Sequence, residues 1–263
     1  MKFFCIIILA CLPFLTIISG DWKLVWTEEF NYTGLPDPAK WNFETRGNAS
    51  GWGNNELQYY TSNETENAYV SDGSLKITAL KKKKENREYT SARITTEGKG
   101  EWKYCKVEVR AKLPGGLGTW PAIWMMPARS EYGWPECGEI DIMEQVGYDP
   151  YVIHSTIHTQ AYNHLKGTQV GKQYDLPTAV SDFHLYGLEW DNHEIRSFVD
   201  GVQYFSYVND QTGNDAWPFD QSFYLILNLA IGGNWGGQKG VNDALFPHVY
   251  EIDYVRIYQK TDQ

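Results

Sequence analysis

The stretch Trp134–Gly147, WPECGEIDIMEQVG, decides how the rest of the chain is interpreted. It places three carboxylates, Glu139, Asp141 and Glu144, in a short run that also carries isoleucine and methionine. Alternation of apolar and polar residues is typical of a β-strand with one face turned to a core. In a regular strand Glu144 would point away from the other two acids. We therefore expect one of the two residues before Glu144 to form a β-bulge that returns it to the acidic face.

Three like charges on neighbouring positions are costly unless a metal ion or a proton-transfer reaction uses them. Residues four ladder positions apart are ~13 Å apart at ~3.3 Å per residue. Side chains that reach inward can bring the carboxyls of Glu139 and Glu144 near the ~5–5.5 Å of retaining glycosidases, and the ~6.5–9.5 Å of inverting enzymes is also within reach. The pattern thus permits glycosidase chemistry, while a metal site and a solvated acidic sheet face remain alternatives.

The first twenty residues contain one lysine and a long apolar run that ends in small residues. Because Pro13 interrupts this run and a polar chain follows, residues 1–20 are predicted to be a secretory signal peptide rather than a membrane-spanning helix. A lipid-attachment signal at Cys11 is the weaker alternative, since the apolar run continues past that residue. We expect a secreted protein, extracellular or periplasmic, with no membrane association after cleavage and one domain over residues 21–263.

The composition limits the classes of molecule that this protein is expected to bind. The formal net charge is −10 and no basic stripe is present, which argues against nucleic acid. An acidic surface also disfavours polyanionic polysaccharides, so a neutral polysaccharide fits better. The 11 tryptophans and 18 tyrosines offer flat apolar faces for stacking against sugar rings. After residue 20 only Cys105 and Cys137 remain, either as one disulfide or as two buried thiols, and no zinc-site spacing occurs.

Short alternating segments separated by turn signals occupy residues 21–263, and no long segment has the 3.6-residue period of a helix. This pattern predicts an all-β protein, an antiparallel sandwich or barrel. The expected strand segments are Trp22–Phe30, Tyr69–Leu80, Ser91–Thr96, Lys103–Leu113, Val152–Thr159, Phe183–Trp190, Glu194–Val199, Phe223–Ala230 and Tyr250–Tyr258.

Two further groups of residues are candidates for a cleft. Trp120 and Trp124 are four residues apart and share a face of a strand, where they form either core or the floor of a groove. The strand that follows the acidic one carries His158, and consecutive strands commonly pair, so this histidine is expected beside the acids. A structural histidine is the alternative.

The run Gly138–Glu144, GEIDIME, resembles the active-site signature of glycoside hydrolase family 16, in the laminarinase-like branch that carries the extra residue. The resemblance covers nearly the whole chain after residue 20. Matching segments follow in order: Trp26–Phe30, Asn55–Tyr60, Ser91–Thr95, Val107–Pro114, Trp120–Met125, Phe198–Gly201, Leu227–Trp235 and Asp253–Arg256.

The resemblance implies an antiparallel β-jelly-roll sandwich of the concanavalin A-like lectin and glucanase type, with a cleft across one sheet. It implies a retaining mechanism in which Glu139 is the nucleophile and Glu144 the general acid and then the general base. Asp141 would lie between them and hydrogen-bond to the nucleophile. This agrees with the need to keep one acid protonated beside an ionised one.

The resemblance also implies binding residues, and no cofactor for catalysis. The expected substrate-binding residues are Trp120, Trp124, Trp235, His158, Arg93, Asn54 and Glu56. Some family members hold a structural calcium ion on the convex side with residues equivalent to Glu29, Gly73 and Asp253, and an oxygen-rich site suits that ion. One departure is Cys105 after Tyr104, where the family usually has glycine, which makes a Cys105–Cys137 disulfide worth testing.

We therefore expect a monomeric, secreted endo-β-1,3-glucanase whose partner is a laminarin-type β-glucan. A mixed-linkage β-1,3(4)-glucanase is the nearest alternative, and an agarose or carrageenan hydrolase of the same fold is more distant because the chain is acidic. A non-catalytic carbohydrate-binding sandwich would have no need for a proton donor beside a nucleophile. A transglycosylase, which passes the covalent intermediate to a sugar hydroxyl, is a further alternative.

Overall fold

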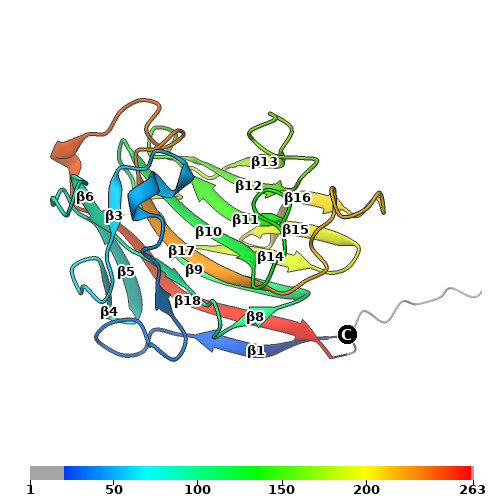
Figure 1. Cartoon of the computed structure of the whole chain (residues 1–263). Helices are drawn as coiled ribbons and strands as arrows, with labels where there is room; N and C mark the ends of the chain where they lie inside the picture. Colours follow the sequence, from blue (N-terminus) through cyan, green and yellow to red (C-terminus); the bar gives the residue numbers. More distant parts are fainter. Residues whose placement is uncertain (1–20, 262–263) are drawn as a thin grey trace, which may run out of the picture.

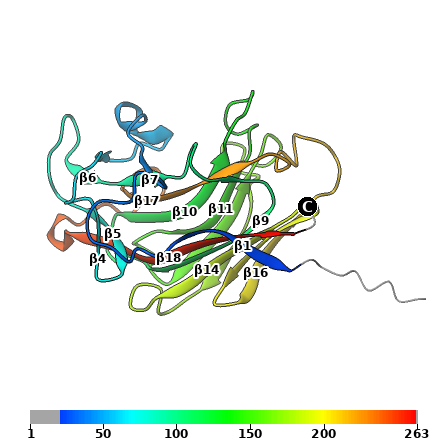
Figure 2. The ribbon, with the colours of Figure 1, turned by 90° about the horizontal axis from the view of Figure 1, so that it is seen from below.

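The computed structural model describes residues 21–261, which form two eight-stranded sheets and a short two-stranded one (Figure 1). All pairings within the two large sheets are antiparallel, which confirms the predicted all-β sandwich. Figure 2 shows the two sheets as two layers, with β10 and β11 in one and β14 and β16 in the other. The predicted signal peptide, residues 1–20, lies outside the described residues.

The first layer, here called the back sheet, joins the two ends of the described chain. Its first and last strands, β1 and β18, pair directly. In spatial order it contains β16 (Val202–Val208), β15 (Glu194–Val199), β14 (His184–Trp190), β9 (Cys105–Lys112), β18 (His248–Lys260), β5 (Ser74–Ala79) and β4 (Ala68–Ser71), with β1 (Trp22–Glu28) beside β18.

The second layer, here called the cleft sheet, carries the acidic strand near its centre. In spatial order it contains β13 (Val170–Asp175), β12 (Val152–His158), β11 (Glu139–Gln145), β10 (Thr119–Pro127), β17 (Phe223–Ile231), β7 (Arg93–Thr95) and β2 (Asn42–Phe43), with β8 (Glu101–Trp102) beside β17. The remaining elements are the parallel pair β3 (Gln58–Tyr60) and β6 (Tyr89–Ser91) and the 3₁₀ turns η1 (Asn48–Gly53) and η2 (Asp243–Leu245).

The core lies between the two sheets and follows from the alternation in the sequence. In β9 every second residue, beginning with Cys105, is buried, while the lysines, glutamate and arginine between them reach the surface. Burial of these apolar side chains supplies the main favourable free energy of folding. Strand β17 differs because all nine of its residues are buried. The segment 48–60 packs against this strand at the border of the cleft, where Asn228 Nδ2 donates to the Tyr60 hydroxyl and the backbone N–H of Ile231 donates to Gln58 Oε1.

The acidic strand contains the predicted β-bulge. Beside β12, the register passes from Asp141 to Glu144 across one residue, Ser155. Beside β10, Met143 has a partner and Ile142 has none, so Ile142 is the extra residue. The side chains of Ile142 and Met143 are both fully buried. Two consecutive residues therefore turn toward the core, and Glu144 returns to the face that Asp141 occupies.

The two cysteines after residue 20 are free thiols. Cys105 and Cys137 are both buried, and burial raises the pKa of Cys137 to about 11. The structure therefore corresponds to the alternative of two buried thiols rather than to the disulfide. Within residues 21–261, no helix has the length and apolar character needed to cross a membrane.

Candidate active site

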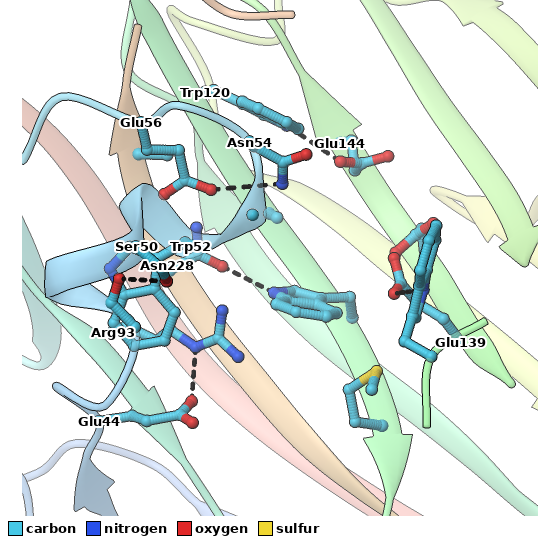
Figure 3. Close-up of a pocket in the computed structure, with 18 of the residues that line it drawn as sticks. Glu44, Ser50, Trp52, Asn54, Glu56, Arg93, Trp120, Glu139, Glu144 and Asn228 are labelled. Atoms are coloured by element: carbon cyan, nitrogen blue, oxygen red, sulfur yellow. Dashed lines mark hydrogen bonds and ion pairs between the residues drawn. The ribbon is translucent and has the colours of Figure 1, made fainter. Parts of the chain in front are cut away.

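A cavity of about 600 Å³ opens over the cleft sheet and contains the three acids (Figure 3). Its lining comes from β7, β10, β11 and β17, and from the loops at 44–56, 134 and 164–165. Glu139, Asp141 and Glu144 all line it, as the bulge requires. Gly138, directly before Glu139, has φ +87°, and a Cβ there would lie 2.8 Å from Pro218 Cγ, so only glycine fits the turn into this strand.

Each outer acid accepts a hydrogen bond from an indole N–H. Trp134 Nε1 donates to Glu139 Oε2 at 2.7 Å, and Trp120 Nε1 donates to Glu144 Oε1 at 2.9 Å. The two bonds fix the carboxyl planes without introducing a positive charge. Trp120 was expected in the cleft, whereas the role of Trp134 was missed, although it begins the acidic stretch.

Asp141 is 2 % exposed and lies between the outer acids. Its Oδ2 has no hydrogen-bond partner among the described residues, and His158 Nε2 lies 3.4 Å from that oxygen. Ligand atoms of Glu139, Asp141 and His158 lie within 4.8 Å of one another, and within residues 21–261 this is the group that could hold a metal ion. The cross-strand pair of Glu139 and His158 places the histidine beside the acids, as expected.

Burial raises the pKa of all three acids. The pKa of Glu139 rises to about 8 through burial and the nearby charge of Asp141, and that of Glu144 rises to about 7 although the Trp120 N–H opposes the change. Burial and the charge of Glu144 raise the pKa of Asp141 well above its ordinary value. The three groups titrate together, so near neutral pH the trio keeps protons that exposed carboxyls would have lost. A proton donor and an ionised neighbour can then coexist.

Arg93 lies between two indole rings. Its guanidinium carbon is 4.5 Å from the centre of the Trp52 ring and 4.6 Å from that of Trp124, and its Nε donates to Glu44 at 2.6 Å. Flat guanidinium and indole groups attract each other in this arrangement. Arg93 thus supports the two rings as well as lining the cleft.

Trp52 was missed at the level of sequence, although a local signal exists. The tripeptide Gly51-Trp52-Gly53 has φ of +62°, +55° and +75°, a left-handed turn that glycine adopts easily. A tryptophan between two such glycines in a polar loop is the signal that would have predicted it.

Trp124, the second ring beside Arg93, is held by a chain of two hydrogen bonds. Trp124 Nε1 donates to Asn228 Oδ1 at 2.7 Å, and Asn228 Nδ2 donates to the Tyr60 hydroxyl at 3.0 Å. Asn228 and Tyr60 are buried. Trp124 is therefore oriented with its ring beside the cavity rather than in the core, which settles the two alternatives for this residue.

Asn54 and Glu56 form part of the cavity wall that faces Glu139 (Figure 3). Glu56 is 6 % exposed, and burial raises its pKa to about 6. It accepts hydrogen bonds from Gln58 Nε2 at 2.5 Å and from Asn54 Nδ2 at 3.5 Å. A buried acid with these donors is suited to accept hydrogen bonds from hydroxyl groups of a sugar.

Trp235 packs against Trp120, whose indole N–H bonds to Glu144. The Trp120 and Trp235 rings meet edge to face with centres 5.5 Å apart, and the His154 ring lies 4.8 Å from that of Trp235. His154, on the same face of β12 as His158, is the cross-strand partner of Glu144. His164 was missed in the sequence. It lines the cavity and packs against Trp134 with ring centres 4.9 Å apart.

The three residues expected to bind calcium all belong to the back sheet or to its turns, on strands other than the one that carries the acids. Glu29 follows β1, Gly73 lies in the turn between β4 and β5, and Asp253 lies at an irregularity of β18. Both carboxylates already have cationic partners. Arg256 donates to Glu29 at 2.8 and 2.9 Å, and Arg110 pairs with Asp253.

Comparisons with known proteins agree with this site. The family model for glycosyl hydrolases family 16 matches residues 55–256. A beta-glucanase of Rhodothermus marinus is 54% identical over 249 residues, 92% of this chain and 86% of that protein. A glucan endo-1,3-beta-glucosidase of Cryptopygus antarcticus is 41% identical over 93% of this chain and 95% of its own length. The crystal structure of the laminarinase from Rhodothermus marinus superimposes with a TM-score of 0.90 at 52% identity and covers 93% of this chain and all of that one.

An antiparallel β-sandwich with a tryptophan-lined cleft and three acids of raised pKa on one bulged strand is the arrangement of a glycoside hydrolase. The chain belongs to glycosyl hydrolases family 16, as the match over residues 55–256 and the identity to the Rhodothermus protein show. Glucanases of this family need no catalytic cofactor.

Proposed function

We propose that this chain is a secreted endo-β-1,3-glucanase that hydrolyses laminarin-type glucans with retention of anomeric configuration. The observation that carries the proposal is the bulged strand β11, which places Glu144 on the face of Glu139 and Asp141 in a tryptophan-lined cavity. The names of the similar glucanases support the choice of glucan.

In the first step Glu139 attacks the anomeric carbon, and the bond from that carbon to the leaving oxygen breaks. Glu144 gives its proton to the leaving oxygen, so the shortened glucan departs as a neutral alcohol. Asp141 lies beside Glu139, and when Asp141 holds the proton it can donate that proton in a hydrogen bond that stabilises the ionised form of Glu139. A covalent glycosyl ester on Glu139 results.

In the second step water attacks the same carbon from the side that the leaving group vacated. Glu144, now ionised, takes the proton of that water, and the ester bond to Glu139 breaks. Two inversions give retention. The indole N–H of Trp134 bonds to Glu139 Oε2 and keeps the carboxyl oriented through both steps.

The choice of a neutral glucan as substrate rests on the tryptophan rings that line the cavity. Trp52 and Trp124, held by Arg93, offer apolar faces to sugar rings, while Asn54 and Glu56 offer polar groups to hydroxyls. This combination suits a neutral glucan better than a sulfated chain, because the wall already contains buried acids that would repel sulfate.

Incubation with laminarin, lichenan and agarose, with product sizes followed over time, tests the substrate. We expect a ladder of oligosaccharides from laminarin at early times, and release of sugars from agarose but not laminarin would overturn the proposal. The same chromatograms show products longer than the substrate if the intermediate passes to sugar hydroxyls.

The mechanism is tested separately. NMR of the first-formed product should show the β anomer, and the α anomer would refute the role of Glu139. A Glu139→Ser variant should lose hydrolysis and retain binding of oligosaccharides, whereas near-normal activity would contradict the assignment.

Secretion and a monomeric state are part of the proposal and rest on the pattern of residues 1–20 and on the acidic surface. Expression of the full chain in a secreting host should release into the culture medium a protein that starts near residue 21. Light scattering of that protein should give the mass of one chain. Retention in cells or a dimer mass would contradict these points.

A calcium ion at the Glu29, Gly73 and Asp253 edge is proposed only as a structural ion. The arginine pairs must open before the carboxylates can bind it, so Arg110 and Arg256 compete with the ion. Chelation should lower the melting temperature without changing the pH optimum, and an unchanged melting temperature would count against the ion.

A further inference from the structure

Side-chain hydroxyls bond to the backbone of the bulge from the side opposite the cleft. Ser155 Oγ donates to the carbonyl oxygen of Asp141 at 2.7 Å and lies 2.7 Å from Ser197 Oγ. The hydroxyl of Tyr204 donates to the carbonyl oxygen of Ile142, the extra residue, at 3.2 Å. Both carbonyls that flank the irregular step are thus bonded by side chains.

The three hydroxyls come from three strands and from both sheets. Ser155 lies on β12 opposite the bulge, Ser197 on β15 and Tyr204 on β16, so two of them come from the back sheet. Ser155 and Ser197 are 1 % and 0 % exposed. A hydroxyl in an apolar core costs free energy unless it is bonded, and alanine would fill either position with little cost. None of the three lines the cavity, so substrate contact does not explain them.

We propose that Ser155, Ser197 and Tyr204 are positioning residues that hold the bulge in register and thereby aim Glu144 at the scissile bond. The inference rests on the proposed function, because it takes Glu144 as the acid and base. A one-residue shift in pairing turns side chains to the other face of a sheet. Tyr204 fixes the extra residue and Ser155 the residue before it, so the two bonds define where the irregular step occurs.

The chemistry of the leaving group separates this role from a general effect on stability. A glucan leaves as an alcohol and needs the proton of Glu144. A dinitrophenolate leaves without a proton, so cleavage of dinitrophenyl β-laminaribioside depends on Glu139 and not on Glu144. Removal of the intermediate still needs Glu144 as base when water attacks. Azide is an anion that needs no base and forms a glycosyl azide.

The test uses Tyr204→Phe and Ser155→Ala in the full-length protein. For laminarin we expect kcat/KM to fall about tenfold or more, since small misplacements of catalytic groups have effects of about a hundredfold. For dinitrophenyl β-laminaribioside we expect kcat/KM to stay within about twofold of wild type and kcat to fall. Azide should then restore kcat and yield the glycosyl azide.

Tyr186→Phe is the matched control. Tyr186 is a fully buried tyrosine on β14 of the same back sheet, and its hydroxyl has no hydrogen-bond partner. Loss of that hydroxyl should leave both substrates unaffected. Ser197→Ala is a milder second variant, because it removes the far end of the serine pair, and it should show the same selectivity for laminarin with a smaller loss.

Two results would overturn the inference: unchanged laminarin activity in both variants, or an equal loss on both substrates in folded protein. A Glu144→Ala variant measured in the same series tests the proposed function itself. If Glu144→Ala shows no dependence on the leaving group and no azide rescue, the assigned role of Glu144 fails. If it shows both and Tyr204→Phe shows neither, only the positioning inference fails.

Discussion

Replacing Glu139 by glutamine should stabilise the protein at high pH, because the native site buries a charge that glutamine lacks. Burial raises the folded-state pKa of Glu139 from its ordinary 4.5 to about 8. Below about pH 4.5 the group is protonated in both states and carries no penalty. As pH rises, the unfolded chain loses the proton first, so the stability of the wild type falls until the folded pKa is passed.

The size of the effect follows from that pKa. A rise from 4.5 to about 8 corresponds, at ~1.4 kcal/mol per pH unit, to an upper bound of about 5 kcal/mol. Glu139 is partly exposed to water in the cleft, and the nearby charge of Asp141 contributes to its raised pKa, so we expect roughly 2–4 kcal/mol at pH 9. For a chain of this size that is a gain of roughly 5–12 °C in melting temperature.

Differential scanning calorimetry of wild type and Glu139→Gln at pH 4.5, 7 and 9 measures the effect as a difference, which removes the contributions of all other groups. The advantage of the variant should be near zero at pH 4.5 and grow to a plateau above pH 8. Glu131→Gln, at an exposed loop residue, is the control and should give no pH-dependent difference. A difference that is constant with pH, or that shrinks as pH rises, would refute the reasoning.

Three further results are expected. The pH profile of kcat/KM for laminarin should be a narrow bell with limbs near about pH 7 and about pH 8, because Glu144 must hold its proton while Glu139 has lost its own and burial raises both pKa values, and a bell centred near the ordinary 4.5 would contradict their burial. Arg93→Lys should raise the KM for laminarin about five- to thirtyfold, since loss of the stack between Trp52 and Trp124 corresponds to about 1–2 kcal/mol, and an unchanged KM would argue against the stack. Reduction with dithiothreitol should leave the melting temperature unchanged because both thiols are free, whereas a drop of several degrees would reveal a disulfide.

The acidic strand was predictable because its information is local. Alternation predicts the strand, and three acids with one residue too many predict the bulge that gathers them on one face, whereas their catalytic roles came from the resemblance to glycoside hydrolase family 16. The choice between Ile142 and Met143 needed the register against both neighbouring strands.

The parts that sequence did not predict depend on groups brought together from distant segments. The stack on Arg93 joins the loop at Trp52 to strand β10, and the pair of Glu29 with Arg256 joins the first strand to the last. Neither has a period or spacing that a sequence pattern would show. The indole of Trp134 is local to the acids, but its direction is set by the loop and not by strand alternation.

The complete burial of β17 has a consequence for how the cleft can change in evolution or engineering. The segment 48–60 forms one wall and also covers β17, through Gln58 to the Ile231 backbone and Tyr60 to Asn228. Exchange of that wall would uncover a central strand, so its sequence is tied to the fold. New substrate preferences should therefore come from single side-chain replacements in this wall rather than from exchange of the whole segment.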